Sequence, residues 1–160
     1  MTGIAISSQV QDSMLGEELT LDECEILAEK MVAHPLKKDE CLVKQNEQVF
    51  TLFVLIEGQL AVVDSEDANA KTVYTMTKGE CAGTRAFVDR KPRTASLKAI
   101  DNALVYTLEP DAFESLIVKH PIIVYKVMRA LFRITHRNLL RMNQESQQLS
   151  NYISKSQGRY

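Results

Sequence analysis

Residues 79–96 read GECAGTRAFVDRKPRTAS, and this stretch carries the strongest signal in the chain. Turns of small residues flank a short apolar segment at 86–88, and a Pro-Arg-Thr-Ala run follows at 92–95 before an alternating strand. Backbone N–H groups at the start of a short helix, with an arginine directed at them, can hold a phosphate group. The stretch therefore predicts an anion-binding site in which Arg93 is the cation.

The bulk properties fit a single domain outside membranes. The chain has 160 residues, 45% of them hydrophobic, and a formal net charge of −2. These values allow one core of ordinary size and give no general attraction to nucleic acid or to an acidic membrane surface. Cys24, Cys41 and Cys81 lack CxxC or zinc-site spacing, and neither a secretory leader nor an apolar run of about 18–20 residues is present. We therefore expect a soluble, cytoplasmic protein with reduced thiols.

The apolar pattern predicts a mainly β fold with flanking helices. Apolar residues alternate with a period of two between residues 32 and 108, and turn residues recur every ~8–12 positions, as in a closed antiparallel roll. Thr20 and Glu23 form a candidate capping box for the first helix. We expect a double-stranded β-helix, or jelly roll, with an N-terminal helix and a long C-terminal dimerisation helix. The expected segments are a flexible N-terminus at 1–16, a domain at 17–142 (helix 17–31, β-roll 32–108, helices 110–142), and the end of the last helix with a tail at 143–160.

The last helix carries two apolar edges. One edge has the alternating spacing of four and three residues that forms the seam of a coiled coil. A second edge flanks its first half, so the helix could pack both on its own roll and on a partner chain; the alternative is one broad face buried in a single core. The seam consists of Tyr125, Met128, Phe132, Leu139, Met142, Leu149 and Ile153, with Thr135 and Ser146 filling the gaps, and the second edge consists of Val124, Val127, Leu131 and Ile134.

The same helix carries an arginine every four residues, at Arg129, Arg133, Arg137 and Arg141. Such a row could face an acidic partner or nucleic acid. It could equally be the solvated face of an amphipathic helix.

The sequence lacks the usual signatures of an enzyme or a metal site. His34, His120 and His136 are scattered without HxH or HExxH spacing. A nucleophile elbow, a P-loop and paired catalytic carboxylates are also missing. We therefore expect a protein that is not an enzyme, with neither catalytic residues nor metal ligands.

Two stretches together resemble a known family. Residues 53–58 read FVLIEG, and residues 79–95 place Gly-Glu, Gly-Thr-Arg-Ala-Phe and Pro-Arg-Thr-Ala in order and without a gap. This order is similar to the phosphate-binding cassette of the cyclic-nucleotide-binding domain family, which includes catabolite-activator-type regulators. The resemblance covers roughly residues 17–142, and we call residues 79–95 the cassette.

The resemblance implies roles for several cassette residues. The backbone around Gly83, Arg85 and Ala86 would cap a cyclic phosphate, Arg93 would pair with its charge, and Thr94 would donate a hydrogen bond. Thr84 stands where the family has the glutamate that accepts from the ribose 2′-hydroxyl. Loss of that charge-assisted bond would weaken a cyclic nucleotide by about one to two decades.

Some of these residues have a plain structural alternative. Arg85 replaces an aliphatic residue and could add a second cation for a more highly charged anion, or turn outward to solvent. Arg93 could be a strand residue that reaches solvent, and Thr84 could cap a turn. Asn138 lies about where the family approaches the base from the last helix, but it also flanks the seam, where it could fix register.

Two functions remain open at this point. The first is a ligand-sensing regulatory module that binds a small anion, with cyclic AMP or cyclic GMP as candidates and no other cofactor, and that reports occupancy through the last helix of a homodimer. The second is a degenerate domain that has lost its ligand and serves as a dimerising protein-interaction scaffold. A helix-turn-helix is not encoded, so we expect no direct DNA binding, and either a stand-alone module or one that works through a protein partner.

Overall fold

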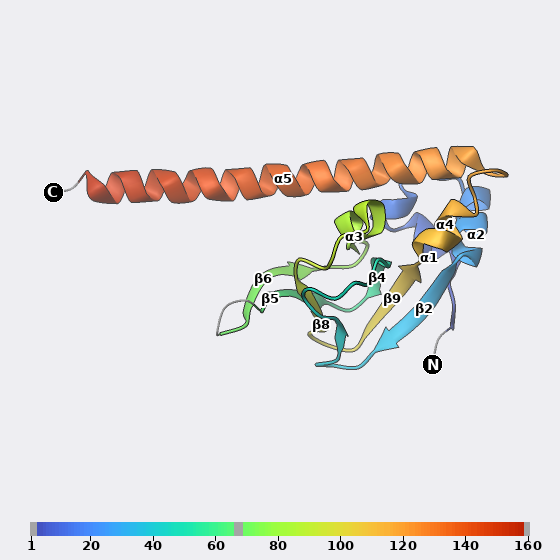
Figure 1. Cartoon of the computed structure of the whole chain (residues 1–160), viewed down its shortest axis with the longest axis horizontal. Helices are drawn as coiled ribbons and strands as arrows, with labels where there is room; N and C mark the ends of the chain where they lie inside the picture. Colours follow the sequence, from blue (N-terminus) through green and yellow to red (C-terminus); the bar gives the residue numbers. More distant parts are fainter. Residues whose placement is uncertain (1–2, 66–68, 159–160) are drawn as a thin grey trace.

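Two antiparallel sheets form the centre of the protein in a computed structural model, which describes residues 3–65 and 69–158 (Figure 1). The first sheet has the strand order β1-β2-β9-β4-β7, and the second has the order β3-β8-β5-β6. The strands are β1 (Gly3–Ile4), β2 (Met31–Leu36), β3 (Cys41–Val43), β4 (Leu52–Glu57), β5 (Leu60–Asp64), β6 (Lys71–Met76), β7 (Cys81–Ala82), β8 (Ser96–Ala99) and β9 (Ala103–Leu108).

The helices lie at the two ends of the strand region and in one insertion. Five are α-helical and one short turn, η1, is a 3-10 helix. They are α1 (Ser7–Gln11), η1 (Met14–Gly16), α2 (Leu21–Glu29), α3 (Thr84–Asp89), α4 (Pro110–Glu114) and α5 (Pro121–Gln157). The prediction of a mainly β fold with flanking helices and a long C-terminal helix is confirmed.

The expectation that the roll closes was wrong. The two sheets remain separate ladders among the described residues, and of their outer strands only β6, with six residues, is longer than three residues. The outer strands β1 and β7 have two residues each, and β3 has three. Strands of this length offer few backbone groups for a further ladder, so the sheets face each other without joining.

Residues 3–16, part of the segment expected to be flexible, form short elements that pack on the rest of the chain. Gly3 and Ile4 pair with Val32 and Ala33 of β2. Val10 of α1 and Leu15 of η1 are almost fully buried in the core that also holds α2 and α5. Val10 and Leu15 thus dock a segment that otherwise consists largely of small and polar residues. Residues 1 and 2 lie outside the described part of the chain.

The first predicted helix is present but shorter than 17–31. The Thr20 Oγ1 accepts from the Glu23 N–H (3.2 Å), and the Glu23 carboxylate accepts from the Thr20 N–H (3.0 Å). This capping box starts α2 at Leu21. The helix ends at Glu29 because Met31 already pairs with Leu108 in the first sheet.

Strand β4 separates two apolar cores. Its Leu52, Val54 and Ile56 face the core formed with the helices, whereas Phe53 and Leu55 face the core between the sheets. Alternate side chains of a strand point to opposite faces, so a continuous apolar run fits a strand covered on both sides.

Helix α5 lies along one side of the sheets and then extends beyond them (Figure 1). Its second apolar edge is buried on the helical core, through residues such as Val127, Leu131 and Ile134. The coiled-coil seam stays exposed along its whole length. The second edge therefore packs on the chain's own core, as expected if the two edges serve different surfaces.

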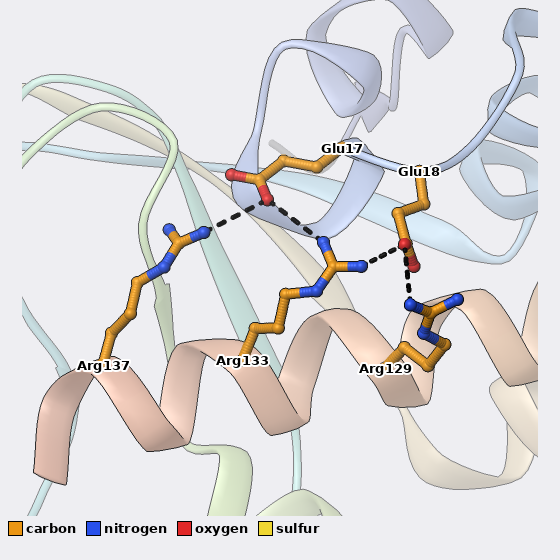
Figure 2. Close-up of polar contacts among 5 residues, drawn as sticks. All are labelled: Glu17, Glu18, Arg129, Arg133 and Arg137. Carbon is orange, nitrogen blue, oxygen red and sulfur yellow. Dashed lines mark hydrogen bonds and ion pairs between the residues drawn. The ribbon is translucent and has the colours of Figure 1, made fainter.

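The arginine row of α5 is held by two glutamates that follow η1 (Figure 2). Arg129 lies 3.5 Å from Glu18, Arg137 lies 3.5 Å from Glu17, and Arg133 contacts both carboxylates. We call these five residues the ion-pair ladder. Three of the four arginines in the row therefore pair with the chain's own N-terminal segment while staying partly exposed, and Arg141 lies 3.9 Å from Glu145 of the same helix.

Within residues 3–65 and 69–158, no helix combines the length and the apolar content that a bilayer span requires.

Candidate functional site

Helix α3 sits inside the cassette and begins directly after Gly83. Gly83 has a φ of +87°, a left-handed conformation that side chains rarely adopt. A Cβ at this position would also lie 1.7 Å from Nη1 of Arg93 and 3.1 Å from the Thr51 carbonyl oxygen. Both the left-handed conformation and the lack of space therefore require glycine at position 83. Because Gly83 has no side chain, the cassette backbone can lie directly against Arg93.

The two ends of α3 are fixed to the rest of the fold. The Phe87 N–H donates to the Gly83 carbonyl (2.9 Å), and the Phe87 ring packs against Phe113 of α4 with ring centroids 5.4 Å apart. The helix ends at Arg90, whose guanidinium lies 2.8 Å from the Glu114 carboxylate of α4. The inserted helix thus has a defined position relative to the sheets.

The backbone of Arg93 is held by the turn that contains Asn46. The Arg93 N–H donates to the Glu47 carbonyl (3.0 Å), and the Arg93 carbonyl accepts from the Asn46 N–H (2.8 Å). Asn46 has a φ of +69°, a left-handed conformation that asparagine tolerates better than most residues. The pair of hydrogen bonds holds the backbone of the loop before β8 in place, from which the Arg93 side chain projects.

The Arg93 side chain turns inward and is only 4% exposed. Its Nη2 donates to the Thr51 carbonyl, and its guanidinium carbon lies 4.7 Å from the centroid of the Phe53 ring. Its Nε and Nη1 are buried without a hydrogen-bond partner in the described part of the chain. The interpretation of Arg93 as a solvent-facing strand residue is therefore wrong.

The charge of Arg93 is only partly compensated. Burial lowers the pKa of its guanidinium to about 10, while the carboxylates of Glu109 and Glu47 raise it. Glu109 itself accepts a hydrogen bond from the Thr51 hydroxyl (2.6 Å). A pKa of about 10 leaves Arg93 cationic at neutral pH, so a charge with two free N–H groups is buried beside the cassette.

A hollow of about 160 Å³ opens between α3 and the Pro-Arg-Thr-Ala run, and we call it the α3 hollow. Six of the seven residues predicted to bind a ligand line it, because the cassette folds back on itself through Gly83 and Arg93. The lining residues are Gly83, Thr84, Arg85, Ala86, Arg93 and Thr94, together with Val62, Ala82, Pro92, Ala95 and Leu97.

The remaining predicted residue, Asn138, is not part of the hollow. It is exposed on α5 and is not among the lining residues, because α5 continues as one straight helix past α3 (Figure 1). The helix meets the second sheet elsewhere, where the Arg141 guanidinium lies 4.0 Å from the centroid of the Tyr74 ring.

Arg85 and Thr94 are both exposed at the mouth of the hollow. The Arg85 side chain turns outward to solvent, which is one of the two orientations expected from the sequence, and it still lines the hollow. It has no ion pair or hydrogen bond in the described part of the chain.

The sequence did not indicate the apolar wall of the hollow, or the residues outside the hollow that contact Arg93. Val62 and Leu97 could have been identified from their place in alternating strands that flank the cassette. Thr51 could not, because its backbone carbonyl is the group that accepts from Arg93 and any residue type has one.

The chemistry of the lining residues allows the hollow to bind an anion. The lining groups supply two guanidinium cations, two hydroxyls and an apolar wall. Across the described residues, no three histidine, cysteine or carboxylate side chains gather where they could hold a metal ion. Cys81 is buried beside the hollow's edge, and burial raises the pKa of its thiol to about 12, which keeps it protonated and unreactive.

Comparison with known proteins gives a consistent result. A family model described as a cyclic nucleotide-binding domain matches residues 33–120, more than half of the chain. A crystal structure of a cyclic nucleotide-binding domain from Methylobacillus flagellatus KT superposes with a TM-score of 0.83 at 17% identity, covering 91% of this chain and 86% of that one.

Two curated relatives are much longer than this chain. A cGMP-dependent protein kinase of Plasmodium berghei is 24% identical over 112 residues, which are 70% of this chain and 13% of the kinase. A cAMP-dependent protein kinase regulatory subunit of Candida albicans is 29% identical over 91 residues, which are 57% of this chain and 19% of the subunit. The chain therefore spans less than a fifth of the length of either relative.

Proposed function

Because this chain belongs to the cyclic nucleotide-binding domain family, we propose that it is a regulatory module that binds a cyclic nucleotide or a related anion in the α3 hollow. Binding rather than catalysis is its role, and the backbone of Gly83 to Ala86 together with Arg93 and Thr94 holds the phosphate group.

Arg93 carries this proposal. A buried cation with unpartnered N–H groups is costly, because each such group loses its hydration without a replacement. Arg93 is one of the residues that line the hollow, and its Nη1 lies directly beneath Gly83; Nη1 and Nε are both covered, so a small shift of the Gly83 backbone on binding would open them to the hollow. An anion in the hollow would supply the missing acceptors and the missing charge.

The test is a calorimetric titration with cyclic AMP and with cyclic GMP. We expect heat of binding at micromolar to millimolar ligand, and loss of that heat in Arg93→Ala. The matched control is Arg90→Ala, because Arg90 belongs to the same segment but pairs with Glu114 outside the hollow. Unchanged binding in Arg93→Ala would contradict the proposed site.

Helix α5 is positioned to report on the cassette. The Tyr74 hydroxyl donates to the Glu80 carboxylate (2.5 Å), and the Arg141 guanidinium stacks on the same Tyr74 ring. Glu80 precedes Gly83 by three residues, so a shift of the cassette on binding acts on the residue that α5 contacts. A ligand that favours one position of the cassette would shift α5 by its differential affinity for the two positions.

The exposed seam of α5 serves a second copy of the chain. From residue 142 to residue 157 every residue of α5 is exposed, and an isolated helix of this length is marginal in water. In a parallel coiled coil of two copies, the residues that flank the seam would contact each other across the dimer. Asn138 of one copy would face Asn143 of the other, and Glu145 would face Ser150, so these contacts would bring no like charges together. A homodimer covers the apolar seam and gives the module a symmetric output.

The alternative function is a scaffold whose pocket no longer binds a nucleotide. Two observations favour it: Thr84 replaces the family's glutamate, and Arg93 already has a structural role through Thr51 and Phe53. Absence of binding heat from cyclic AMP and cyclic GMP at millimolar concentration, in a protein that remains dimeric, would support the scaffold.

A further inference from the structure

The α3 hollow has an unusual balance of charge. Arg85 and Arg93 both line it, and none of its described lining residues is a carboxylate. Arg85 forms no ion pair in the described part of the chain, and Arg93 keeps two N–H groups unpartnered while it is 4% exposed. The hollow therefore offers two guanidinium groups and no anionic acceptor for a sugar hydroxyl.

The hollow is also small. Its volume is about 160 Å³, whereas sites for drug-sized ligands span roughly 300–1,000 Å³. Apart from the two arginines and the threonines, its wall is formed by side chains such as Val62 and Leu97. A charged head group with a compact body fits this space better than a ligand held through many polar contacts.

We propose that the α3 hollow selects a phosphate group with two negative charges, as in a phosphomonoester, over the single charge of a cyclic phosphodiester. A phosphomonoester carries about −1.5 to −2 charges at pH 7 and three strong acceptor oxygens, which can satisfy both guanidinium groups. This inference rests on the proposed function of the hollow as an anion site.

The charged residues around Arg85 and Arg93 determine how strongly the hollow should prefer a dianionic phosphate over a monoanionic one. Glu47 and Glu109 face Arg93 from outside the hollow and oppose the effect of burial on it. Arg85 is exposed at the mouth and has no such neighbour among the described residues. The second charge of the ligand therefore acts mainly on Arg85.

The experiment compares four probes on the full chain by calorimetry at pH 7.5 and pH 5.0: ribose 5-phosphate, 5′-AMP, cyclic AMP and inorganic phosphate. Ribose 5-phosphate and 5′-AMP are phosphomonoesters, and cyclic AMP has the same base and sugar as 5′-AMP with one charge fewer. We expect 5′-AMP to bind about tenfold more tightly than cyclic AMP at pH 7.5, as one additional charge-assisted contact would give. At pH 5.0 that advantage should fall about tenfold, because the second phosphate pKa is near 6.

Two variants separate the charge effect from a general loss of binding. Arg85→Gln should weaken both ligands, and it should weaken 5′-AMP about tenfold more than cyclic AMP, which removes most of the preference. Arg90→Gln is the matched control and should leave both affinities unchanged, because Arg90 pairs with Glu114. Thr84→Glu places a carboxylate in the hollow that can accept from the ribose 2′-hydroxyl, and it should strengthen cyclic AMP relative to 5′-AMP, because repulsion from the carboxylate grows with ligand charge.

The outcomes distinguish this inference from the proposed function. Cyclic AMP binding as tightly as 5′-AMP at pH 7.5, or a preference that does not change with pH, would overturn the inference and leave the proposed function intact. No heat from any probe at millimolar concentration would overturn both. Inorganic phosphate binding as tightly as ribose 5-phosphate would support selection of the dianion and identify free phosphate as its source.

Discussion

Arg93 lies directly beneath Gly83, so that a Cβ on Gly83 would come within 1.7 Å of the Arg93 Nη1. The cassette can reach this position only because Gly83 has no side chain and adopts a φ of +87°. One glycine thus determines how closely the backbone of the hollow approaches its buried cation.

Gly83→Ala should destabilise the protein by about 2–3 kcal/mol in urea unfolding and abolish anion binding. The matched control is Gly79→Ala, since Gly79 has a φ of +92° but no atom within 3.7 Å of the added Cβ. We expect Gly79→Ala to cost only about 1 kcal/mol, the cost of the backbone conformation. Equal losses in the two variants would contradict the close approach of Arg93.

Arg93→Met should abolish anion binding without lowering the stability of the ligand-free protein. The substitution removes two unpartnered buried N–H groups and keeps the side-chain volume, so we expect a gain of about 1 kcal/mol in the free energy of unfolding. Unfolding is measured in urea at one fixed protein concentration, beside Arg90→Met. A loss of more than about 2 kcal/mol would mean that the guanidinium is chiefly structural.

Removing both acids of the ion-pair ladder, Glu17→Gln with Glu18→Gln, should weaken the docking of α5 on the N-terminal segment. We expect a loss of about 1–2 kcal/mol at low salt, which is larger than for an isolated surface pair because three arginines share two carboxylates. The loss should fall by about half or more in 1 M NaCl. Glu145→Gln is the control, since Glu145 faces only Arg141 at 3.9 Å.

Leu139→Glu should convert the protein to a monomer. Leu139 lies on the exposed seam and its neighbour Leu140, with a similar exposed fraction (48% against 53%), lies off it. A charge at a seam position opposes association, whereas one at Leu140 stays in solvent. Light scattering should give the monomer mass for Leu139→Glu and twice that mass for Leu140→Glu; two equal masses would refute the seam.

The pair formed by Glu23 of α2 and Lys126 of α5 should make stability depend on pH. Their charged atoms are 2.6 Å apart, and the hydrogen bond from Lys126 is the largest of the effects that lower the Glu23 pKa below its ordinary 4.5. A carboxyl whose pKa is lowered in the folded state stabilises above its unfolded pKa, and this contribution is lost as the pH falls through the folded value. Glu23→Gln, which keeps the capping box, should therefore cost about 0.5–1 kcal/mol at pH 7.

The difference between Glu23→Gln and the unsubstituted protein should shrink as the pH falls below 4.5 and vanish once the pH lies below the lowered pKa of Glu23, where the carboxyl is protonated in both states. Glu25→Gln, on the exposed face of the same helix, is the control and should show no such difference. A Glu23→Gln deficit that is independent of pH would mean that the pair does not contribute through its charge.

The sequence predicted those structural features that depend on residues close to one another in the chain. The capping box of Thr20 and Glu23, the left-handed turn at Asn46 and the two edges of α5 all follow from residues near one another in the chain, and the structure contains each of them. The order of residues in the cassette also placed Arg93 and Gly83 at one hollow.

Other features depend on segments that are distant in sequence. The ion-pair ladder joins residues more than 110 positions apart, and no spacing pattern in α5 could indicate that Glu17 and Glu18 would be its partners. The same holds for Asn138, whose distance from the hollow follows from the straight course of α5 over α3 (Figure 1).

The sequence by itself determined the family, the type and order of the main elements, and the residue types available to an anion. Only the tertiary structure decided that Arg93 would be buried against Thr51 and Phe53, and that its N–H groups would meet the backbone of Gly83. Periodicity and capping act over a few residues, so they are visible in the chain as written. The direction of a single guanidinium depends on backbone carbonyls and ring faces that distant strands bring together, and a sequence does not record them.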